Sequence, residues 1–406
     1  MSAPLVVVGA GQGGLQVAES LRSGGYKEQL LLLGEEAHLP YQRPPLSKGL
    51  LLGEMEPQQL TLRQPVVYDR KGIEPRLQSR VVSLDRSHRT LGLADGTSLG
   101  YHKLVLATGA RPRPLPLPGA DAAGVHSLRT LDDTQAIAAS LASARRVVVI
   151  GGGFIGLEMA AVATKLGKVV TVVESAERLM ARVVAPEISA FYQALHESNG
   201  CRILLGRGVN ELLPDASGRV SSVVLTDGET LSADMVVVGI GVQPNDELAA
   251  AAGIDCEGGV VTDACGRTSD PHVYAIGDCA ARRLEDASLR RLESVQNAVE
   301  SAKACAAAIL GQEKPFTAAP WFWSDQYDTK LQMVGLSTGS DETVLRGDPQ
   351  ARQFSYCYFK AGELLAIDSI NRPADHMLGR KLLDGPNTLT PVQAADTAFD
   401  LKAALV

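Results

Sequence analysis

The sequence of 406 residues lacks several features that would assign it to a common functional class. Lys and Arg total 39 against 46 Asp and Glu, so the net charge is −7 and no cationic excess is available for nucleic-acid phosphates. The six cysteines lie at least nine positions apart, which excludes the C-x-x-C motif of zinc sites, dithiols and iron–sulfur clusters. The seven histidines show no H-x-x-x-H spacing. We therefore expect no nucleic-acid partner and no metal site.

Long uncharged apolar runs are also missing. The most apolar stretch, residues 147–173, contains Glu158, Lys165 and Lys168, which argues against a membrane span. No basic leader precedes the first apolar segment, residues 5–8, so we expect no signal peptide. Dispersed cysteines suit a reducing compartment. These absences together predict a cytoplasmic protein.

Glycine is abundant, at 40 residues, and part of it belongs to an internal repeat. The segment 6–14 recurs as 148–156, and Gly9, Gly11 and Gly14 match Gly151, Gly153 and Gly156 at a single offset of 142. A second repeated pair, residues 95–112 and 227–244, ends in strands that close with Gly109 and Gly241. Continuous apolar strands of this kind are typical of parallel sheets. The repeat predicts one α/β plan used twice.

Each repeated glycine turn follows an apolar strand and precedes an expected helix, residues 15–21 and 157–166. In that context the first glycine permits a tight turn, the second lets a pyrophosphate approach the backbone, and the third lets helix and strand pack closely. The helix N-terminus offers free N–H groups to the phosphates. A strand–turn–helix of this kind can also occur without a nucleotide, but two copies favour two dinucleotide sites.

Acidic residues follow the second strand of each copy, where a carboxylate can bind a ribose 2′-hydroxyl. Glu174 occupies this place in the second copy, and Glu35, with Glu36 as the alternative, occupies it in the first. A carboxylate repels a 2′-phosphate, so the second copy should prefer NADH over NADPH. Arg178 and Arg182 follow closely and weaken that preference.

Two further segments complete the plan. A short strand before Gly277 and Asp278 puts a carboxylate where it could bind a ribityl hydroxyl of a flavin. From about residue 315 aromatic residues become frequent, and alternating segments follow at 331–337, 342–346 and 353–359. We expect a smaller α+β domain there, with a terminal helix near 394–405. The predicted fold class is thus α/β, with two Rossmann-like dinucleotide-binding domains and a C-terminal α+β domain.

The motifs, taken together and in order, resemble the two-dinucleotide flavoprotein reductases of the glutathione-reductase-like superfamily. The resemblance rests on Gly9–Gly14, Ala107–Gly109, Gly151–Gly156 and Ile276–Asp278. Other segments resemble the NADH-dependent ferredoxin reductases of oxygenase systems: Tyr41–Lys48, Leu128–Leu131, Glu293–Ala298 and Pro320–Gln326. The segment Ile370–Asp375 is more similar to the branch that serves bacterial cytochrome P-450 monooxygenases than to the dioxygenase branch.

This resemblance implies a discontinuous FAD domain of residues 1–112 and 245–316, an NADH domain of 113–244, and a C-terminal domain of 317–406. It also implies roles for single residues toward the FAD. They are Gly11, Gly13 and Gly14 at the pyrophosphate, Glu35 at the adenosine ribose, Val81 at the adenine, Arg43 near the phosphates, Arg129 along the cofactor, Asp278 at the ribityl chain, and Lys48, Val295 and Trp323 at the isoalloxazine, with Thr108 and Gly109 in the adjoining motif. Relatives often have Ala-Gly where this chain has Gly13 and Gly14, a small change.

The segment 44–49, beside the flavin in this resemblance, has no cysteine, unlike disulfide reductases and NADH peroxidases. The reduced flavin would have no thiol relay, and the cysteines are expected to be small buried residues. Lys48 would stabilise negative charge near flavin N5, and Glu158 would pair with Lys48 and then meet the nicotinamide. A helix starting near Gln296 would support the N1 side of the ring. Both charges could instead be ordinary surface residues.

The expected activity is electron transfer from NADH through FAD, one electron at a time, to a [2Fe–2S] ferredoxin that serves an oxygenase. Docking an acidic ferredoxin on this chain needs a local basic patch. The candidates are Arg282, Arg283, Arg290, Arg291, Lys330, Arg372, Arg380 and Lys381, each of which could equally be a scattered solvated charge. The alternatives are a reductase for a dioxygenase, a rubredoxin- or nitrite-type reductase, a plain NADH dehydrogenase, and, from another class, a redox-sensing NADH-binding signalling flavoprotein.

Overall fold

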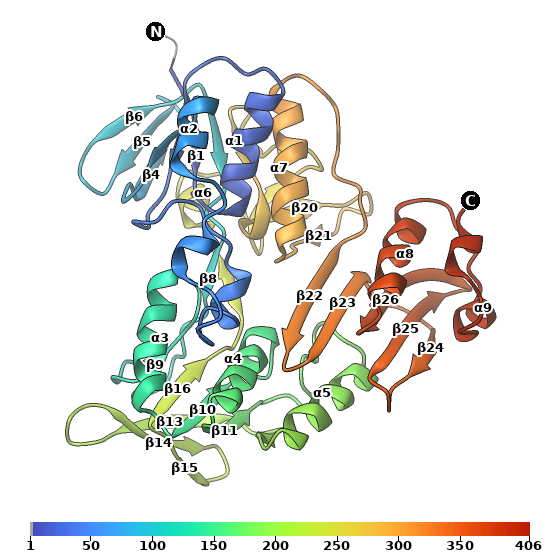
Figure 1. Ribbon diagram of the computed structural model, residues 1–406. Coiled ribbons are helices and arrows are strands. Elements are labelled where there is room, and N and C mark those ends of the chain that lie inside the picture. The colour runs from blue at the N-terminus through green and yellow to red at the C-terminus, as the bar shows by residue number, and fades with distance from the viewer. Residues whose placement is uncertain (1–2) are drawn as a thin grey trace. The chain divides into compact units, whose positions relative to one another are not determined.

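The computed structural model describes residues 3–406 and divides into two compact units (Figure 1). The first unit runs to Gln42 and continues with Gln58–Arg111 and Gln243–Pro320. The second contains Arg43–Pro57, Pro112–Val242 and Trp321–Val406. Where the chain passes between them, strands β8 (Ala110–Pro112) and β17 (Val242–Pro244) form a two-stranded ladder.

The first unit is built on a five-stranded sheet in the order β19-β7-β1-β2-β3, with every pair parallel. Its strands are β1 (Leu5–Val8), β2 (Leu30–Leu33), β3 (Glu74–Arg76), β7 (Lys103–Leu106) and β19 (Val273–Ala275). The residues of β1 and β2 are all buried, as expected for a parallel sheet covered on both faces.

Helices and small sheets surround this sheet. Helix α1 (Gln12–Ser23) lies beside α7 (Val295–Ile309) (Figure 1), and the unit also holds α2 (Pro65–Lys71) and α6 (Glu247–Ala251). A meander is formed by β4 (Val81–Asp85), β5 (Thr90–Leu93) and β6 (Ser98–Gly100). A further three-stranded sheet of this unit contains β18 (Val260–Thr262), β20 (Ala280–Arg283) and β21 (Leu289–Arg290).

The second unit repeats the plan. Its parallel sheet has the order β12-β11-β10-β16-β9. The strands are β9 (Val125–His126), β10 (Arg146–Ile150), β11 (Val169–Val173), β12 (Arg202–Leu204) and β16 (Met235–Val238), and the helices are α3 (Leu131–Ser143), α4 (Phe154–Lys165) and α5 (Pro186–Ser198). The meander is β13 (Val209–Pro214), β14 (Val220–Leu225) and β15 (Thr230–Ser232).

The same unit carries an antiparallel sheet in the order β22-β23-β26-β25-β24. Its strands are β22 (Trp321–Gln326), β23 (Thr329–Gly335), β24 (Glu342–Asp348), β25 (Gln353–Lys360) and β26 (Glu363–Ile370), and α8 (Pro373–Asp384) packs on it. A two-residue turn, Tyr327 and Asp328, joins β22 to β23.

The expected architecture is confirmed: two strand–glycine turn–helix units with meanders, and a C-terminal α+β domain. The domain boundaries stay a prediction. The expected terminal helix over 394–405 is wrong, because α9 (Pro391–Ala395) ends before Asp396 and only a 3₁₀ turn, Leu401–Ala404, follows. The side chains of Asp396 and Asp400 accept hydrogen bonds from the nearby N–H groups of Ala398 and Lys402, which favours turns over helix. Within residues 3–406, no helix is long and apolar enough to cross a membrane.

Candidate dinucleotide and hydride-transfer sites

The glycine turn of the first unit has the geometry that the sequence predicted. Gly9 has φ +112°, and a Cβ there would lie 2.1 Å from the Ala107 carbonyl oxygen. A Cβ on Gly14 would lie 1.9 Å from the Gly9 carbonyl oxygen, so only glycine lets α1 meet β1 this closely. A Cβ on Gly11 would meet no atom within 4 Å. The first and third glycines are thus required by packing, and the second leaves open space for a pyrophosphate.

The position after Gly11 tolerates small changes. A Cβ on Gly13 would make its closest contact, 3.4 Å, with the Ala298 carbonyl oxygen, which is ordinary van der Waals distance. The Ala-Gly of relatives would therefore also fit. The N-terminus of α1 has no acidic residue in its first turn, and Gly11 provides no capping side chain, so its N–H groups remain available to phosphate oxygens.

Three further predicted residues follow strands of the same sheet, at its carboxyl edge, where α/β sheets bind ligands. Gly109 (φ +69°) comes after β7, and Asp278 lies half-buried after β19. Thr108 donates its hydroxyl proton to the Asn245 carbonyl oxygen at 2.6 Å, and the Asn245 amide donates to the Thr108 carbonyl at 2.9 Å. The Thr108 hydroxyl proton is therefore already donated within the protein. In a nucleotide site, Thr108 would contribute its backbone rather than this proton.

The two acidic candidates after β2 differ in their surroundings. Glu36 accepts a hydrogen bond of 2.5 Å from the Tyr41 hydroxyl, which ties it to the loop. The Glu35 side chain is 70% exposed, and its nearest cation, the Arg80 Nε, is 3.9 Å away. This geometry favours Glu35 as the ribose-binding carboxylate.

Val81 begins the meander, and Val295 is the first residue of α7, one position before the expected start. Ser294 caps this helix by accepting from the Asn297 N–H at 3.0 Å. With no acidic residue in its first turn, α7 presents the positive end of its dipole, as required of a helix that supports an electron-rich ring.

The second unit carries an equivalent turn. Gly151 has φ +105°, and its Cβ would lie 2.5 Å from the Gly239 carbonyl oxygen. A Cβ on Gly156 would lie 2.1 Å from the Gly151 carbonyl oxygen, whereas one on Gly153 would meet a single atom, at 3.9 Å. Gly241 (φ +101°) follows β16 at the same edge, and a Cβ there would lie 3.2 Å from the Arg182 guanidinium. The three glycines of this turn therefore have the same steric roles as their counterparts in the first turn: packing requires the first and third, and the second leaves open space.

Glu174 lies across this turn. Its carboxylate accepts from the Gly152 N–H at 2.6 Å and from the Ala176 N–H at 2.8 Å. Arg178 donates to the Val184 and Ala181 carbonyls and to Ser189, which holds the guanidinium on the chain's own acceptors. Arg178 is thus fixed by the local backbone and does not pair with Glu174.

Lys48 and Glu158, 110 positions apart in the chain, form an ion pair. The Lys48 Nζ lies 2.7 Å from the Glu158 Oε2, and the two side chains are 20% and 2% exposed. Glu158 projects from α4 just after the glycine turn, and Lys48 follows the 3₁₀ helix Pro44–Ser47. Glu158 is buried and Lys48 is partly buried, so neither residue is an ordinary surface charge.

Sequence reasoning missed two hydroxyls that bind the same carboxylate. Ser47 donates to Glu158 Oε2 at 2.5 Å, and Ser324 donates to Oε1 at 2.6 Å. Ser324 in turn accepts from the Gln326 amide at 3.2 Å. The one sequence signal was the i, i+2 spacing of Ser324 and Gln326, which puts both on one face of β22.

Of the other predicted residues of this unit, Arg43 contacts Arg129, and Trp323 lies in a cluster of aromatic residues. Arg43 donates to the Arg129 carbonyl at 2.6 Å. Trp323 packs against Trp321 with ring centroids 5.6 Å apart, and Phe322 of the same strand packs against Phe154 at 4.6 Å. Because Phe154 is the first residue of α4, the aromatic strand β22 reaches the glycine turn.

Comparison with known proteins settles the family. Residues 3–302 match the family described as pyridine nucleotide-disulphide oxidoreductase, and residues 321–405 match the reductase C-terminal family. The chain belongs to the pyridine nucleotide-disulphide oxidoreductase family. It is 46% identical over 402 residues to rhodocoxin reductase of Rhodococcus erythropolis, covering 99% of this chain and 94% of that protein.

Two solved structures resemble the reductase over its whole length. The ferredoxin reductase for the CYP199A2 system of Rhodopseudomonas palustris has a TM-score of 0.97 and 48% identity, with 100% of both chains covered. The covalent putidaredoxin reductase–putidaredoxin complex gives a TM-score of 0.95 and 39% identity, with 99% of both chains covered. The protein is therefore an FAD-dependent oxidoreductase of the ferredoxin reductase type that uses a nicotinamide dinucleotide, as the sequence predicted. Its open Gly11 cradle and uncapped α1 N-terminus fit the FAD pyrophosphate.

The cysteines of the reductase are free thiols, and five of the six are buried, as expected. Burial raises the pKa of Cys201 and Cys357 to about 12, so these thiols stay protonated at neutral pH. Cys256 is partly exposed, which corrects the expectation that all six are buried. Within residues 3–406, no group of three His, Cys, Asp or Glu side chains could hold a metal ion.

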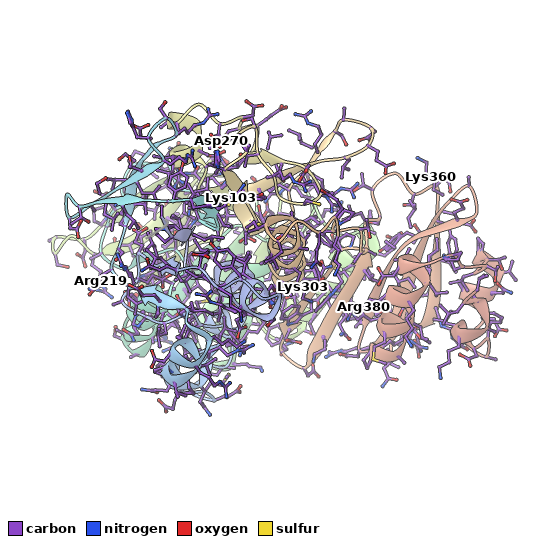
Figure 2. All side chains as sticks on the ribbon, turned by 90° about the horizontal axis from the view of Figure 1, so that it is seen from above. Lys103, Arg219, Asp270, Lys303, Lys360 and Arg380 are labelled. Atoms are coloured by element: carbon purple, nitrogen blue, oxygen red, sulfur yellow. The ribbon has the colours of Figure 1, made fainter. Side chains whose placement is uncertain are left out.

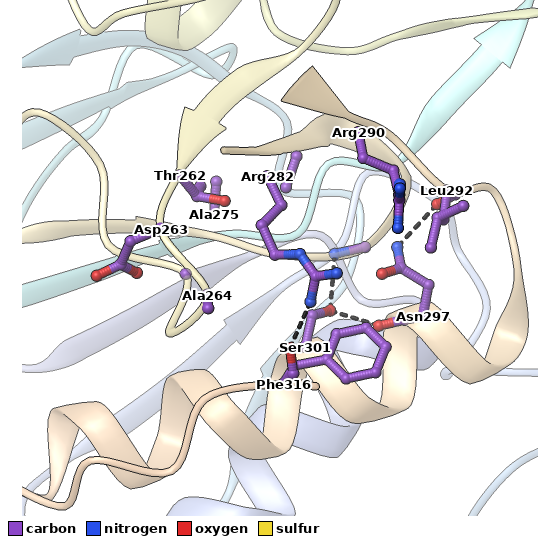
Figure 3. Close-up of a pocket in the computed structure, with 13 residues that line it drawn as sticks. Thr262, Asp263, Ala264, Ala275, Arg282, Arg290, Leu292, Asn297, Ser301 and Phe316 are labelled. Atoms are coloured by element: carbon purple, nitrogen blue, oxygen red, sulfur yellow. Dashed lines mark hydrogen bonds between the residues drawn. The ribbon is translucent and has the colours of Figure 1, made fainter. Parts of the chain in front are cut away.

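A pocket in the first unit shows the surroundings of one docking candidate, Arg282. It lies between β20, β21 and α7 and is lined by Arg282, Arg290, Asn297, Ser301 and Phe316, among others, but by none of the predicted nucleotide-binding residues. Figure 3 shows the Arg282 side chain pointing toward Phe316. Its guanidinium donates to the Phe316 carbonyl at 2.5 Å and lies 4.8 Å from the ring centroid. Arg282 is thus partly buried and held by Phe316, which makes it a weaker docking candidate than a fully exposed cation.

Proposed function

We propose that the protein is an NADH-dependent ferredoxin reductase that passes electrons from NADH through FAD, one at a time, to a [2Fe–2S] ferredoxin serving an oxygenase, most simply a bacterial cytochrome P-450 monooxygenase. The observation that carries the proposal is the ion pair of the buried Glu158 with Lys48, a residue of the cysteine-free segment 44–49, where a disulfide reductase would carry a thiol. The relatives named above support the ferredoxin acceptor and the oxygenase context.

In this proposal FAD supplies the redox chemistry, because it accepts a hydride and can release electrons singly. The protein's residues bind and orient. Gly11, Gly13 and Gly14 bind the pyrophosphate with the α1 N-terminus, Glu35 binds the adenosine ribose, and Val81 contacts the adenine. Asp278 binds the ribityl chain. The remaining FAD contacts are assigned to Arg43, Lys48, Thr108, Gly109, Arg129, Val295 and Trp323.

The second unit would bind NADH. Gly151, Gly153 and Gly156 with the α4 N-terminus bind its pyrophosphate, Gly241 lines the same edge, and Glu174 binds the adenosine ribose hydroxyls. Two backbone N–H groups hold the Glu174 carboxylate in place. A 2′-phosphate would meet this negative charge, so NADH is the preferred reductant.

Lys48 and Glu158 are assigned to hydride transfer. In this role they would hold the nicotinamide against the flavin in the orientation that hydride transfer requires. With both cofactors bound, Glu158 would exchange its Lys48 contact for the nicotinamide amide or ribose, and the Lys48 ammonium would then be available to stabilise negative charge on the flavin. The carboxylate keeps its two serine donors during this exchange, so it need not be left without partners.

Docking of the acidic ferredoxin is assigned to exposed cations. Among the candidates of the second unit, Arg372 is bound to Asp375 at 2.5 Å and Lys330 lies 3.8 Å from Asp325, so their charges are largely compensated. Arg380 is exposed on α8 (Figure 2), above the Trp321 ring at 4.7 Å, and Lys381 is exposed beside it. We assign Arg380 and Lys381 to the docking patch. The dispersed cysteines are the basis for placing this enzyme in the cytoplasm.

The deciding experiment mixes the yellow holoprotein, NADH and cytochrome c, with and without a [2Fe–2S] ferredoxin. Strong acceleration by the ferredoxin is expected. No acceleration by any of a panel of oxygenase ferredoxins refutes the proposal. Stimulation by rubredoxin instead identifies a rubredoxin reductase, and reoxidation that stays very slow with every acceptor identifies a signalling flavoprotein.

A further inference from the structure

Glu158 is the end point of a buried hydrogen-bond chain that runs through three secondary-structure elements of the second unit. The chain consists of Tyr327 Oη to His196 Nδ1 (3.2 Å), His196 Nε2 to Gln326 Oε1 (2.8 Å), Gln326 Nε2 to Ser324 Oγ (3.2 Å) and Ser324 Oγ to Glu158 Oε1 (2.6 Å). His196, Ser324, Gln326 and Glu158 are each no more than 3% exposed. Bulk water is therefore excluded from these groups.

Every hydrogen bond in this chain points toward the carboxylate. The Gln326 oxygen faces His196, so the imidazole must carry its proton on Nε2 and accept at Nδ1 from the Tyr327 hydroxyl. The Gln326 NH₂ faces the Ser324 oxygen, which leaves the single Ser324 proton for Glu158. Burial lowers the pKa of His196 and raises that of Tyr327 to about 12, so both groups keep the neutral forms that this direction requires.

We propose that Ser324, oriented by Gln326 and His196, is a positioning residue for hydride transfer, and that β22 of the C-terminal domain thereby completes the site. This inference rests on the role proposed above for Lys48 and Glu158. Its basis is that the two carboxylate oxygens of Glu158 have different donors: Oε2 binds Lys48 and Ser47, and Oε1 binds Ser324.

The physical reason is rotational. The terminal torsion of a glutamate is broad, so one oxygen bound to Lys48 leaves the other free to swing unless a second donor fixes it. A hydrogen bond to a carboxylate is charge-assisted and directional. When Glu158 releases Lys48, Ser47 and Ser324 are the groups that still define where the carboxylate lies. Displacement of a reacting geometry by about 1 Å can cost up to 10²-fold in rate.

The test uses the holoenzyme and anaerobic stopped-flow reduction of the bound flavin by NADH, with no ferredoxin present. Ser324→Ala should lower the limiting rate by about tenfold, with the half-saturating NADH concentration changed by less than about threefold, because a positioning defect acts on the reaction geometry rather than on uniform binding. The matched control is Ser369→Ala. Ser369 is a fully buried serine of the same sheet whose hydroxyl is bonded to Ser355. It should keep the wild-type rate.

A second variant keeps the serine but redirects its hydrogen bond away from Glu158. In Gln326→Glu both carboxylate oxygens are acceptors, so the Ser324 proton is drawn to residue 326 and away from Glu158. This variant should reproduce the slow reduction of Ser324→Ala, with normal flavin content as the sign of a folded holoenzyme. The Ser324 hydroxyl and its volume are intact in this variant, so slow reduction here cannot come from packing lost at Ser324.

Glu158→Gln separates the two proposals. If this variant reduces its flavin at the wild-type rate, the role assigned to Glu158 is wrong, and the positioning role falls with it. If Glu158→Gln is slow while Ser324→Ala and Gln326→Glu match the wild type, hydride transfer at Glu158 stands and the positioning proposal is overturned. Slow reduction in all three, with a normal Ser369→Ala control, supports both.

Discussion

Replacing Lys48 by Met tests the buried ion pair as both a structural and a catalytic feature. The Lys48 Nζ and Glu158 Oε2 are 2.7 Å apart, which corresponds to a Coulomb attraction of roughly 6 kcal/mol at an effective dielectric constant of about 20. Desolvation of both ions offsets much of this energy. Removing one partner of a buried pair typically costs about 3–5 kcal/mol, because the other charge is left uncompensated. Since Lys48 is partly exposed and Glu158 keeps two serine donors, we expect a destabilisation at the low end of this range, about 3 kcal/mol.

The double variant Lys48→Met with Glu158→Gln separates the two effects. It removes both charges, and the amide can still accept from Ser324, so its stability should return to within about 1 kcal/mol of the wild type. Hydride transfer should stay slow, at least tenfold below the wild type, in both variants. Urea unfolding of the holoenzyme gives the stabilities, and anaerobic stopped-flow gives the rates. A wild-type rate in Lys48→Met, or a double variant as unstable as the single one, would contradict this reasoning.

Four other outcomes are expected. Gly14→Ala should abolish flavin binding, because its Cβ would lie 1.9 Å from the Gly9 carbonyl oxygen, whereas Gly13→Ala, with a closest contact of 3.4 Å, should keep a full flavin spectrum. Glu174→Gln should raise KM for NADH by about tenfold and improve the relative use of NADPH; equal loss with both nucleotides would remove Glu174 from the ribose site. Burial raises the pKa of Asp368 to about 7, so its neutral form stabilises the fold fully below about pH 4, and this contribution is lost as pH rises through 7. Asp368→Asn should therefore flatten the pH dependence of urea stability between pH 4 and 7, by up to about 1.4 kcal/mol per pH unit, and an unchanged profile would contradict the assignment. Ferredoxin-coupled cytochrome c reduction should slow as salt rises, while direct ferricyanide reduction should not; a salt-independent coupled rate counts against docking by Arg380 and Lys381.

The parts of the fold that the sequence predicts well are those that depend on local pattern. Apolar runs, glycine spacing and meander signals lie within a few dozen residues of one another, and α1, α4 and α7 begin within a few residues of their expected starts. Gly9 and Gly14 can be predicted for the same reason, because the close contact between them lies within one turn.

The parts that were missed depend on distant contacts or on local competition. Ser47 and Ser324 reach Glu158 across separations of 111 and 166 residues, and no spacing rule connects a serine in a loop, a glutamate in a helix and a serine in a strand. Arg282 looks like a fully exposed cation in the sequence, yet the Phe316 carbonyl and ring hold it partly buried. The prediction of a terminal helix was wrong because Asp396 and Asp400 favour local turns, although the apolar spacing suits a helix.

The two-residue turn between β22 and β23 has a consequence for how this domain can change in evolution. Tyr327 adopts φ +55° in that turn, and the register pairs Gln326 with Thr329 and Ser324 with Leu331. Side chains alternate between the faces of a strand, so slipping β22 by one residue would turn Ser324 and Gln326 away from α4 and bring Trp323 and Asp325 in their place. Insertions are usually tolerated best in hairpin turns, but here the loop length itself is fixed by a carboxylate far away in the sequence. We therefore expect functional homologues to vary in the residues of this turn and not in their number.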